Sequence, residues 1–320
     1  DRRHDRGEEV PDSLQVLRLH RQLGGLSVEA RRGYMLETPQ VLGKAGYTWE
    51  SLAGWLQGPM DKGAWEAIIP SMGYMSLLRN LRNFDEAEVS DEVATQVCKL
   101  LADPEQVARS RQFPFRFYSA FVHAPSLRWG QALETALGHA VKNIPNLGGR
   151  TLILVDTSAS MTSVGFSARS TVTPAIAAAL FGVSLAVKGE QVDLHGYADG
   201  VFRHQVRKGA SVLKEVERFV GRTGEVGHGT ETAAALRTTY AGHDRVVVIT
   251  DGQCFADYRG SVTKAVPAGV PMYGWNLGGY KAAMMPLDGT RHEFGSLTDS
   301  AFQMLPLLEA GRDARWPWIG

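Results

Sequence analysis

Five oxygen-bearing side chains follow apolar segments in the C-terminal half of the sequence. Asp156, Ser158 and Ser160 alternate in "DTSAS", directly after the apolar run "TLILV". Thr230 lies in "GHGTET", and Asp251 ends the apolar run "VVVIT". Two carboxylates and three hydroxyls, with no sulfur or imidazole among them, form a ligand set for a hard cation, with Mg²⁺ the best fit and Mn²⁺ or Ca²⁺ as alternatives. The pattern predicts a divalent-metal site.

A parallel β-sheet is expected to bring these side chains to one edge. After the linker "NIPNLGGR" (143–150), buried strands are predicted in "TLILVD", "QVDLHGYAD", "DRVVVITDG" and "PMYGWNL". Helices are predicted in "TPAIAAALFGVSLAVKG", "ASVLKEVERFVG", "TETAAALRTTYAG" and near residues 258–266, the first of them capped by Thr173 with Pro174 at its first position. This alternation is typical of a doubly wound, Rossmann-like α/β domain, here spanning 150–320, in which ligands bind beyond the carboxyl ends of the strands.

Two other interpretations of these motifs compete with a metal site. Ser, Thr, Asp and Gly are common in any turn between a strand and a helix. A catalytic site would need further motifs, and no GxSxG, Walker A or HExxH sequence is present, while Ser158 stands where a phosphatase-type pair would need a second Asp. Three segments in the right order favour the metal site, and the protein is not expected to be an enzyme.

The N-terminal half has apolar residues at helical spacing from Ser13 to about Lys142, which predicts seven to nine short antiparallel helices over residues 1–145. Helix starts are expected at Asp12 or Ser13, at Thr48 and at Asp61. The helices would stack as in a HEAT-like repeat solenoid, although the sequence contains no clear repeat.

A window without acidic residues, from Gln106 to Leu133, combines basic and aromatic side chains. Single-stranded RNA is bound by such a combination of cations and stacking surfaces, although the aromatic residues could equally fill the helical core and the arginines face solvent. Arg79 and Arg82, three residues apart in "LLRNLRN", are expected to share a helix face, for RNA or for structural ion pairs. The candidate RNA-binding residues are Arg109, Arg111, Arg116, Arg128, Arg79 and Arg82.

The motif D-x-S-x-S, a later Thr and a strand-terminal Asp resemble the metal-ion-dependent adhesion site (MIDAS) of von Willebrand factor A domains. The resemblance implies that Ser158, Ser160 and Thr230 touch the ion and that Asp156 and Asp251 act through water, with Thr232 a weaker candidate for the Thr position. An ion held mainly by neutral hydroxyls can still attract an anionic oxygen. A metal-dependent protein-interaction module that captures an acidic residue of a partner is therefore the alternative function.

The segments "MGYMSLLRNLRNF" and "VATQVCKLLADPEQVARSRQFPFRFYSAF" resemble the helical-repeat ring of the TROVE domain, the Ro autoantigen (Ro ribonucleoprotein) family, in which the ring precedes a von Willebrand factor A domain. The resemblance implies a cytoplasmic RNA-binding protein without nuclease activity. Its expected ligands are small non-coding Y-like RNA and single-stranded 3′ ends of misfolded RNA, with an exoribonuclease as a protein partner. The sequence begins at Asp1 and enters the ring about halfway, so the N-terminal part of the ring is expected to be absent.

The composition places few further limits on the function. Lys plus Arg and Asp plus Glu each number 34, so the net charge indicates neither a nucleic acid nor an anionic membrane as a partner. No apolar run approaches the roughly 20 residues of a membrane span, and the start of the sequence lacks the apolar core of a signal peptide. A soluble protein that does not bind membranes is expected.

Overall fold

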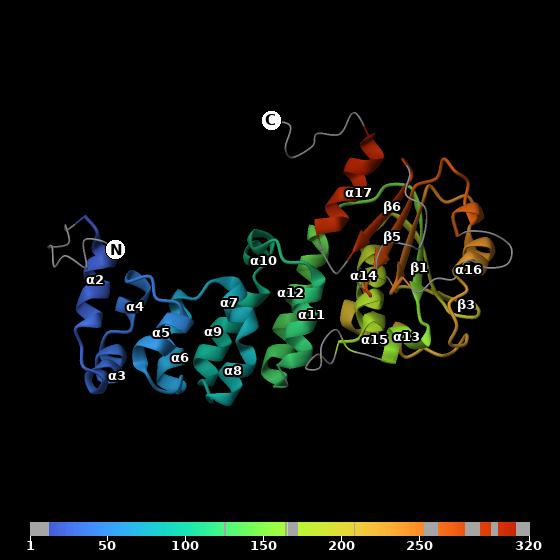
Figure 1. Ribbon diagram of the computed structural model, residues 1–320. Helices are drawn as coiled ribbons and strands as arrows, with labels where there is room; N and C mark the ends of the chain where they lie inside the picture. Colours follow the sequence, from blue (N-terminus) through green and yellow to red (C-terminus); the bar gives the residue numbers. More distant parts are fainter. Residues whose placement is uncertain are drawn as a thin grey trace. The chain divides into compact units, whose positions relative to one another are not determined.

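The structure of the protein is a computed structural model that describes residues 13–124, 126–163, 165, 172–207, 209–252, 262–278, 289–295 and 300–311 (Figure 1). It has two compact units. The first comprises residues up to 106 together with 123–133, and the second comprises 107–122 together with 134–320. Most of helix α11 (Pro114–His123) therefore belongs to the second unit, with the sheet.

Short helices account for the N-terminal half of the described chain. In order they are α2 Gln15–Gly24, α3 Val28–Glu37, α4 Gln40–Lys44, α5 Trp49–Leu56, α6 Lys62–Ile68, η1 Ile69–Ser71, α7 Tyr74–Arg79, α8 Leu81–Glu86, α9 Asp91–Ala102, α10 Pro104–Ser110, α11 Pro114–His123, η2 Leu127–Trp129, α12 Gly130–Ala140 and η3 Val141–Asn143. Isolated helices of this length are marginal in water, so packing of their apolar faces must stabilise them.

The predicted caps at Thr48 and Asp61 are confirmed. The Thr48 hydroxyl accepts the Ser51 amide hydrogen, and the Asp61 carboxylate accepts that of Ala64. The first described helix begins at Gln15, and its N-cap is Leu14 without a side-chain hydrogen bond, so the cap expected at Ser13 is wrong by one residue. Asp12 lies outside the described residues.

The helix expected to carry both Arg79 and Arg82 is two helices. Between α7 and α8, Asn80 has φ −107° and ψ 8°, outside helical values. Its side-chain amide donates to the Ser76 carbonyl at 2.8 Å, and Asn83 donates to the Asn80 side-chain oxygen at 2.7 Å. An Asn side chain that bonds to nearby backbone and side-chain groups competes with the helical ladder. The expectation that the two arginines share one helix face is therefore wrong, and such breaks also make the helices more numerous than predicted.

The second unit contains a six-stranded sheet in the order β3-β2-β1-β4-β5-β6. All neighbouring strands are parallel except β2 and β3. The elements are β1 Arg150–Asp156, α13 Ala159–Ser163, α14 Pro174–Lys188, β2 Gln191–Tyr197, β3 Val201–His204, α15 Val212–Val220, α16 Thr232–Thr239, β4 Arg245–Thr250, η4 Val262–Ala265, β5 Met272–Asn276, β6 Arg291–Gly295 and α17 Ser300–Ala310.

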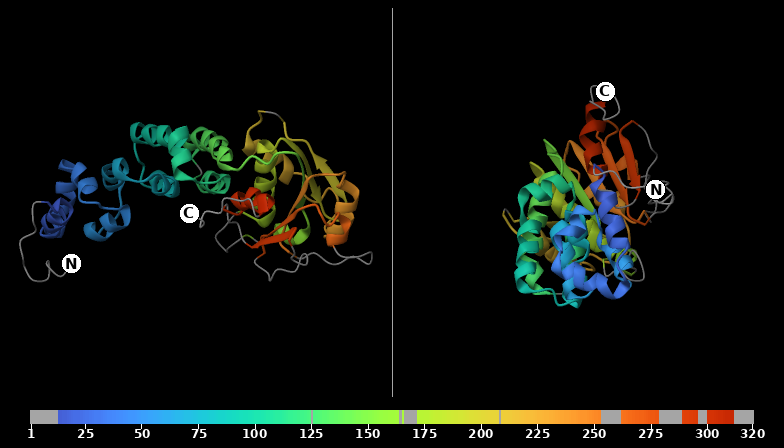
Figure 2. Two further views of the ribbon diagram at one scale, coloured as in Figure 1. Left: turned by 90° about the horizontal axis from the view of Figure 1, so that it is seen from above. Right: turned by 90° about the vertical axis from the view of Figure 1, so that its left-hand side faces the viewer.

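Helices cover both faces of this sheet, as Figures 1 and 2 show for α14 and α16. On one face, α16 packs on Leu152 and Leu154 of β1 in a buried apolar cluster. On the other, α14 approaches so closely that a Cβ at Gly182 would lie 2.7 Å from the Val155 side chain. The predicted doubly wound α/β fold after a helical segment is confirmed, and the four predicted strands are present. The helix expected near 258–266 is described only at η4, because 253–261 lie outside the described residues.

The chain reverses its direction of travel across the sheet beside β1. It proceeds from β1 to β2 on one side and later places β4 on the other side of β1. The carboxyl ends of β1 and β4 therefore flank a topological switch point, the position at which open α/β sheets bind ligands. Asp156 ends β1, and Asp251 directly follows β4.

Candidate metal centre and nucleic-acid interface

Asp156 is buried at the switch point and held in place from two strands. It is 0% exposed, and Asp251 is 5% exposed. Asp156 Oδ1 accepts the backbone amide hydrogen of Ser158 at 2.8 Å, and Oδ2 accepts the hydroxyl hydrogen of Thr250 at 2.6 Å. The last residue of β4 thus orients the last residue of β1. The sequence interpretation overlooked Thr250, because a Thr at a strand end is too common to stand out.

Two serine hydroxyls lie directly beyond Asp156. Ser158 Oγ and Ser160 Oγ are 3.2 Å apart, with Ser158 buried and Ser160 half-buried. The turn of the backbone into α13 brings them together. The structure thus places Asp156, Ser158 and Ser160 in one cluster at the sheet edge.

The segment that carries Thr230 is tied to this cluster through its backbone. The Ala159 amide donates to the His228 carbonyl at 3.1 Å. Thr230 is half-buried and precedes α16, which begins at Thr232 and not at Thr230 as expected. The Thr232 hydroxyl is fully buried and donates to the Tyr197 hydroxyl at 3.1 Å, so Thr230 is the better donor for an ion.

The electrostatic surroundings of Asp156 favour a positive charge. Burial raises the pKa of Asp156 to about 6, hydrogen bonds from Thr250 and Ser158 oppose this rise, and the nearby Asp251 carboxylate adds to it. The groups that shift this pKa are hydroxyls, an amide and a second carboxylate. A buried carboxylate in such surroundings is costly unless a cation compensates it.

The donor chemistry fits a hard divalent ion. Asp156, Ser158, Ser160, Thr230 and Asp251 offer only oxygen atoms, which Mg²⁺ prefers. Within the described ranges, no three His, Cys, Asp or Glu side chains gather as a metal-binding group. The mixed set of hydroxyls and carboxylates is therefore the candidate metal centre of the described chain.

Three of the candidate RNA-binding arginines are exposed in the second unit. Arg109 lies near the end of α10, Arg111 directly after it with φ 51°, and Arg116 in α11. The neighbouring aromatic residues Phe113, Phe117 and Tyr118 are at most 8% exposed and pack in the core. The core interpretation of these three aromatics is therefore correct, and any RNA contact here would use the arginines.

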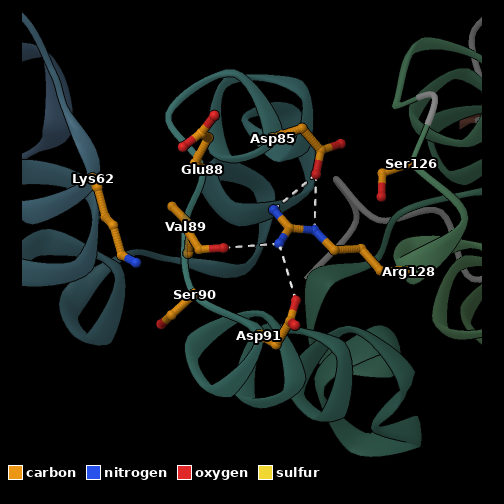
Figure 3. Close-up of a pocket in the computed structure, with 8 residues that line it drawn as sticks. All are labelled: Lys62, Asp85, Glu88, Val89, Ser90, Asp91, Ser126 and Arg128. Atoms are coloured by element: carbon orange, nitrogen blue, oxygen red, sulfur yellow. Dashed lines mark hydrogen bonds and ion pairs between the residues drawn. The ribbon is translucent and has the colours of Figure 1, made fainter.

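Arg128 lies in a groove of the first unit and is engaged by acceptors (Figure 3). Its Nε donates to Asp85 Oδ1 at 2.8 Å, its NH2 nitrogen lies 2.8 Å from the same oxygen, and NH1 donates to the Val89 carbonyl at 2.8 Å. The groove has a volume of about 750 Å³, and its lining also includes Glu88, Asp91 and Lys62. Three carboxylates face two cations here, which disfavours contact with RNA phosphates and indicates a structural role for Arg128.

The remaining two candidates lie in the first unit. Arg79 is exposed at the end of α7. Arg82 forms an ion pair with Glu86 at 2.8 Å, with side-chain exposures of 67% and 58%. Such an exposed pair contributes little to stability, so Arg82 remains available for an anionic ligand.

We expect Arg128→Ala to lower the free energy of unfolding by about 2–3 kcal/mol, because it leaves the Asp85 carboxylate, 17% exposed, without its charged donor. Arg82→Ala is the matched control, since it removes an exposed pair and should change stability by at most about 0.5 kcal/mol. Urea denaturation followed by circular dichroism measures both. Equal, small effects would show that the Arg128 pair is not structural.

Comparisons with known proteins agree with this architecture. Residues 46–125 match the model of the TROVE domain. The crystal structure of the Ro (RSR) protein of Deinococcus radiodurans is similar, with a TM-score of 0.71, 19% sequence identity, and coverage of 92% of this chain and 63% of that chain. None of the curated proteins compared with the chain matches it. The chain thus spans less than two thirds of the Deinococcus protein, and at 19% identity the structural likeness shows the fold alone.

The sequence match and the structural likeness are consistent with each other. The likeness to the Deinococcus structure covers 92% of this chain and so includes both helical residues and the six-stranded sheet. The TROVE match falls on the helical half, where the quoted motifs lie. Residues 46–125 are accordingly similar to the TROVE domain, as those motifs predicted, and the chain shares its fold with a Ro protein.

Proposed function

We propose that this chain is an RNA-binding protein of the Ro type. Its ligands would be small non-coding Y-like RNAs and the single-stranded 3′ ends of structured or misfolded RNA. The TROVE match over residues 46–125 is the observation that supports this proposal most strongly. The exposed Arg109, Arg111 and Arg116 supply cations for phosphate groups, and the neutral overall charge requires that such contacts be local.

The proposal includes a divalent cation at the carboxyl edge of the sheet, with Mg²⁺ the best fit. Ser158, Ser160 and Thr230 would contact the ion directly, and Asp156 and Asp251 would hold its water ligands. A bound cation would supply a positive charge that attracts an anionic oxygen. The buried, hydrogen-bonded Asp156 supports this assignment, because its carboxylate requires compensation.

A second candidate function uses the same site without RNA. If hydroxyls provide most of the ligands, the ion keeps enough charge to capture an Asp or Glu of a partner protein. The Ser158 and Ser160 hydroxyls, 3.2 Å apart beside Asp156, favour this candidate. In it the helices would serve as a scaffold only.

A pull-down from cell lysate separates the two functions. The RNA-binding function predicts small RNAs that co-purify and are lost after ribonuclease treatment. The protein-interaction function predicts a protein partner that is insensitive to ribonuclease and is released by a chelator. Recovery of neither RNA nor a chelator-sensitive partner would count against both.

Purified protein is expected neither to degrade RNA nor to hydrolyse nucleotides. The sequence contains no GxSxG, Walker A or HExxH motif to accompany the ion. The measurement is the release of labelled nucleotides over hours with Mg²⁺ present, beside the variant Asp251→Ala. Turnover by the wild type that exceeds turnover by this variant would contradict the prediction.

The proposed location is the cytoplasm. In the described part of the chain, none of the helices combines the length and apolar character that crossing a membrane requires. Fractionation of cells that express the tagged chain tests the location.

A further inference from the structure

Asp199 connects two segments that meet at the candidate metal centre. It lies in the turn between β2 and β3, at the carboxyl edge of the sheet. Its Oδ2 accepts the His228 backbone amide hydrogen at 2.9 Å. The Gly229 amide also donates to this carboxylate, and the two bonds hold the pKa of Asp199 below its usual range. One exposed side chain thus satisfies two successive amides just before Thr230.

The glycines on either side of His228 leave room for this carboxylate. At Gly227, with φ +95°, a Cβ would lie 1.9 Å from Asp199 Oδ2. At Gly229 a Cβ would lie 2.1 Å from Asp199 Oδ1. The "GHG" sequence before Thr230 is therefore explained by the close approach of Asp199.

Backbone hydrogen bonds extend the attachment on both sides of Thr230. The Gly200 amide donates to the Val226 carbonyl at 3.0 Å, and the Glu231 amide donates to the Ala198 carbonyl at 3.0 Å. The His228 carbonyl in turn accepts the Ala159 amide of the "DTSAS" loop at 3.1 Å. The 226–231 segment is thereby fixed to the β2–β3 turn and to the loop that carries Ser158 and Ser160.

We propose that Asp199 is a positioning residue of the metal centre, which holds the 226–231 segment so that the Thr230 hydroxyl can reach a cation at Ser158 and Ser160. This inference rests on the proposed metal site and adds to it a residue that contributes no ligand. Without the carboxylate, the segment that carries Thr230 would have to become ordered when the ion binds. The conformational entropy that this segment then loses would reduce the affinity for the ion. Loss of groups that orient ligands typically costs about 10- to 100-fold in metal affinity.

Asp199→Asn is the first test. An Asn side chain has only one accepting oxygen and carries no charge, so the contact with the two amides should be weaker than in wild type. Titration calorimetry of Mg²⁺ into the metal-free full chain should show an affinity about 10- to 100-fold below that of wild type. The melting temperature of the metal-free variant should confirm that it is folded.

Glu190→Gln is the matched control. Glu190 directly precedes β2 and accepts the Gly149 amide at 3.3 Å at the amino edge of the sheet, so this variant also removes one charge and weakens one contact with an amide. Its Mg²⁺ affinity should equal that of wild type. An equal loss in both variants would assign the effect to net charge and overturn the positioning role.

A double-mutant cycle tests the contact itself. Gly229→Ala places a methyl group against the Asp199 carboxylate and should weaken Mg²⁺ binding. In the Asp199→Ala background the carboxylate is absent and the methyl group fits, so Gly229→Ala should cause little further loss of Mg²⁺ affinity. Strictly additive losses would overturn the proposal. If Asp199→Asn does not fold, Gly229→Ala still tests the contact with the carboxylate in place.

The outcomes distinguish this inference from the metal site on which it rests. In one outcome, wild type binds Mg²⁺ while the Mg²⁺ affinity of folded Asp199→Asn differs from that of wild type by less than about threefold, well short of the loss expected for a positioning residue. In that case Asp199 has only a structural role, and the proposed metal site stands. If wild type shows no binding, both proposals are overturned. Loss of binding in Asp199→Asn together with intact binding in Glu190→Gln supports the inference, even where the residual affinity is too weak to measure.

Discussion

Replacing Arg109, Arg111 and Arg116 together with glutamine is expected to flatten the salt dependence of binding to a single-stranded 3′ tail. Each phosphate contact to a single strand contributes about −0.7 to the slope of log affinity against log salt, so three contacts weaken wild-type binding by about 20-fold between about 50 and 200 mM salt. Glutamine removes the charge but keeps much of the stem that can pack on neighbouring residues. Fluorescence anisotropy with a labelled RNA tail at several salt concentrations gives the slope.

The triple replacement with lysine is the control for this prediction. Lysine keeps the charges, so the slope should remain close to that of wild type, because counterion release depends on charge. Both variants must melt at the wild-type temperature before binding is compared. If the glutamine variant is stable and its slope and affinity are unchanged, these arginines form a solvated face, and Arg79 and Arg82 are the next pair to test.

The sheet domain could be predicted from the sequence because its strands are buried on both faces. A strand such as β4, with every residue buried, appears in the sequence as a continuous apolar run. The edge strands β3 and β6 were not predicted. Their partly exposed sequences, "VFRH" and "RHEFG", alternate in burial or remain half-buried, and short segments of this kind resemble loops.

The candidate site was predictable to the extent that chain topology determines it. Parallel strands end at one edge, so Asp156 and Asp251 had to lie close to each other once β1 and β4 were neighbours. Contacts between loops were not predictable. The hydrogen bond from Thr250 to Asp156 and the hydrogen bonds from two backbone amides to Asp199 cannot be predicted from the sequence. Thr and Asp occur in many turns, where their side chains bond to the nearby backbone, so their presence alone does not indicate a contact between loops.

Arg128 shows why an acid-free window in the sequence need not be acid-free in space. Its partner Asp85 lies 43 residues earlier, in α8. The packing of the helices in the first unit brings this carboxylate to the guanidinium, and Trp129 also donates to it at 2.9 Å. The charge pattern along the chain therefore does not by itself identify an RNA surface. Exposure favours Arg109, Arg111 and Arg116 over Arg128.

Mg²⁺ or Mn²⁺ is expected to raise the melting temperature of the chelator-treated chain, and Asp156→Ala is expected to remove this increase while the fold is retained. A ligand present at about 100 times its Kd stabilises the native state by about 2.7 kcal/mol, which corresponds to several degrees for a unit of this size. Differential scanning fluorimetry with millimolar ion or EDTA measures the change. Glu190→Gln, at the opposite edge of the sheet, should keep the full increase.

The pH dependence of this increase provides a second check on the same site. The pKa of Asp156 is about 6 in the metal-free fold against an ordinary value of 3.8, so the protonated carboxyl stabilises the fold below about pH 4 and this contribution is lost as the pH rises through 6. A cation stabilises the ionised carboxylate and competes with the proton. The increase in melting temperature caused by Mg²⁺ should therefore be larger at pH 7.5 than at pH 5. The assignment of these five residues to a metal centre would be contradicted if, after complete removal of bound metal, the melting temperature of wild type did not respond to the ion at either pH.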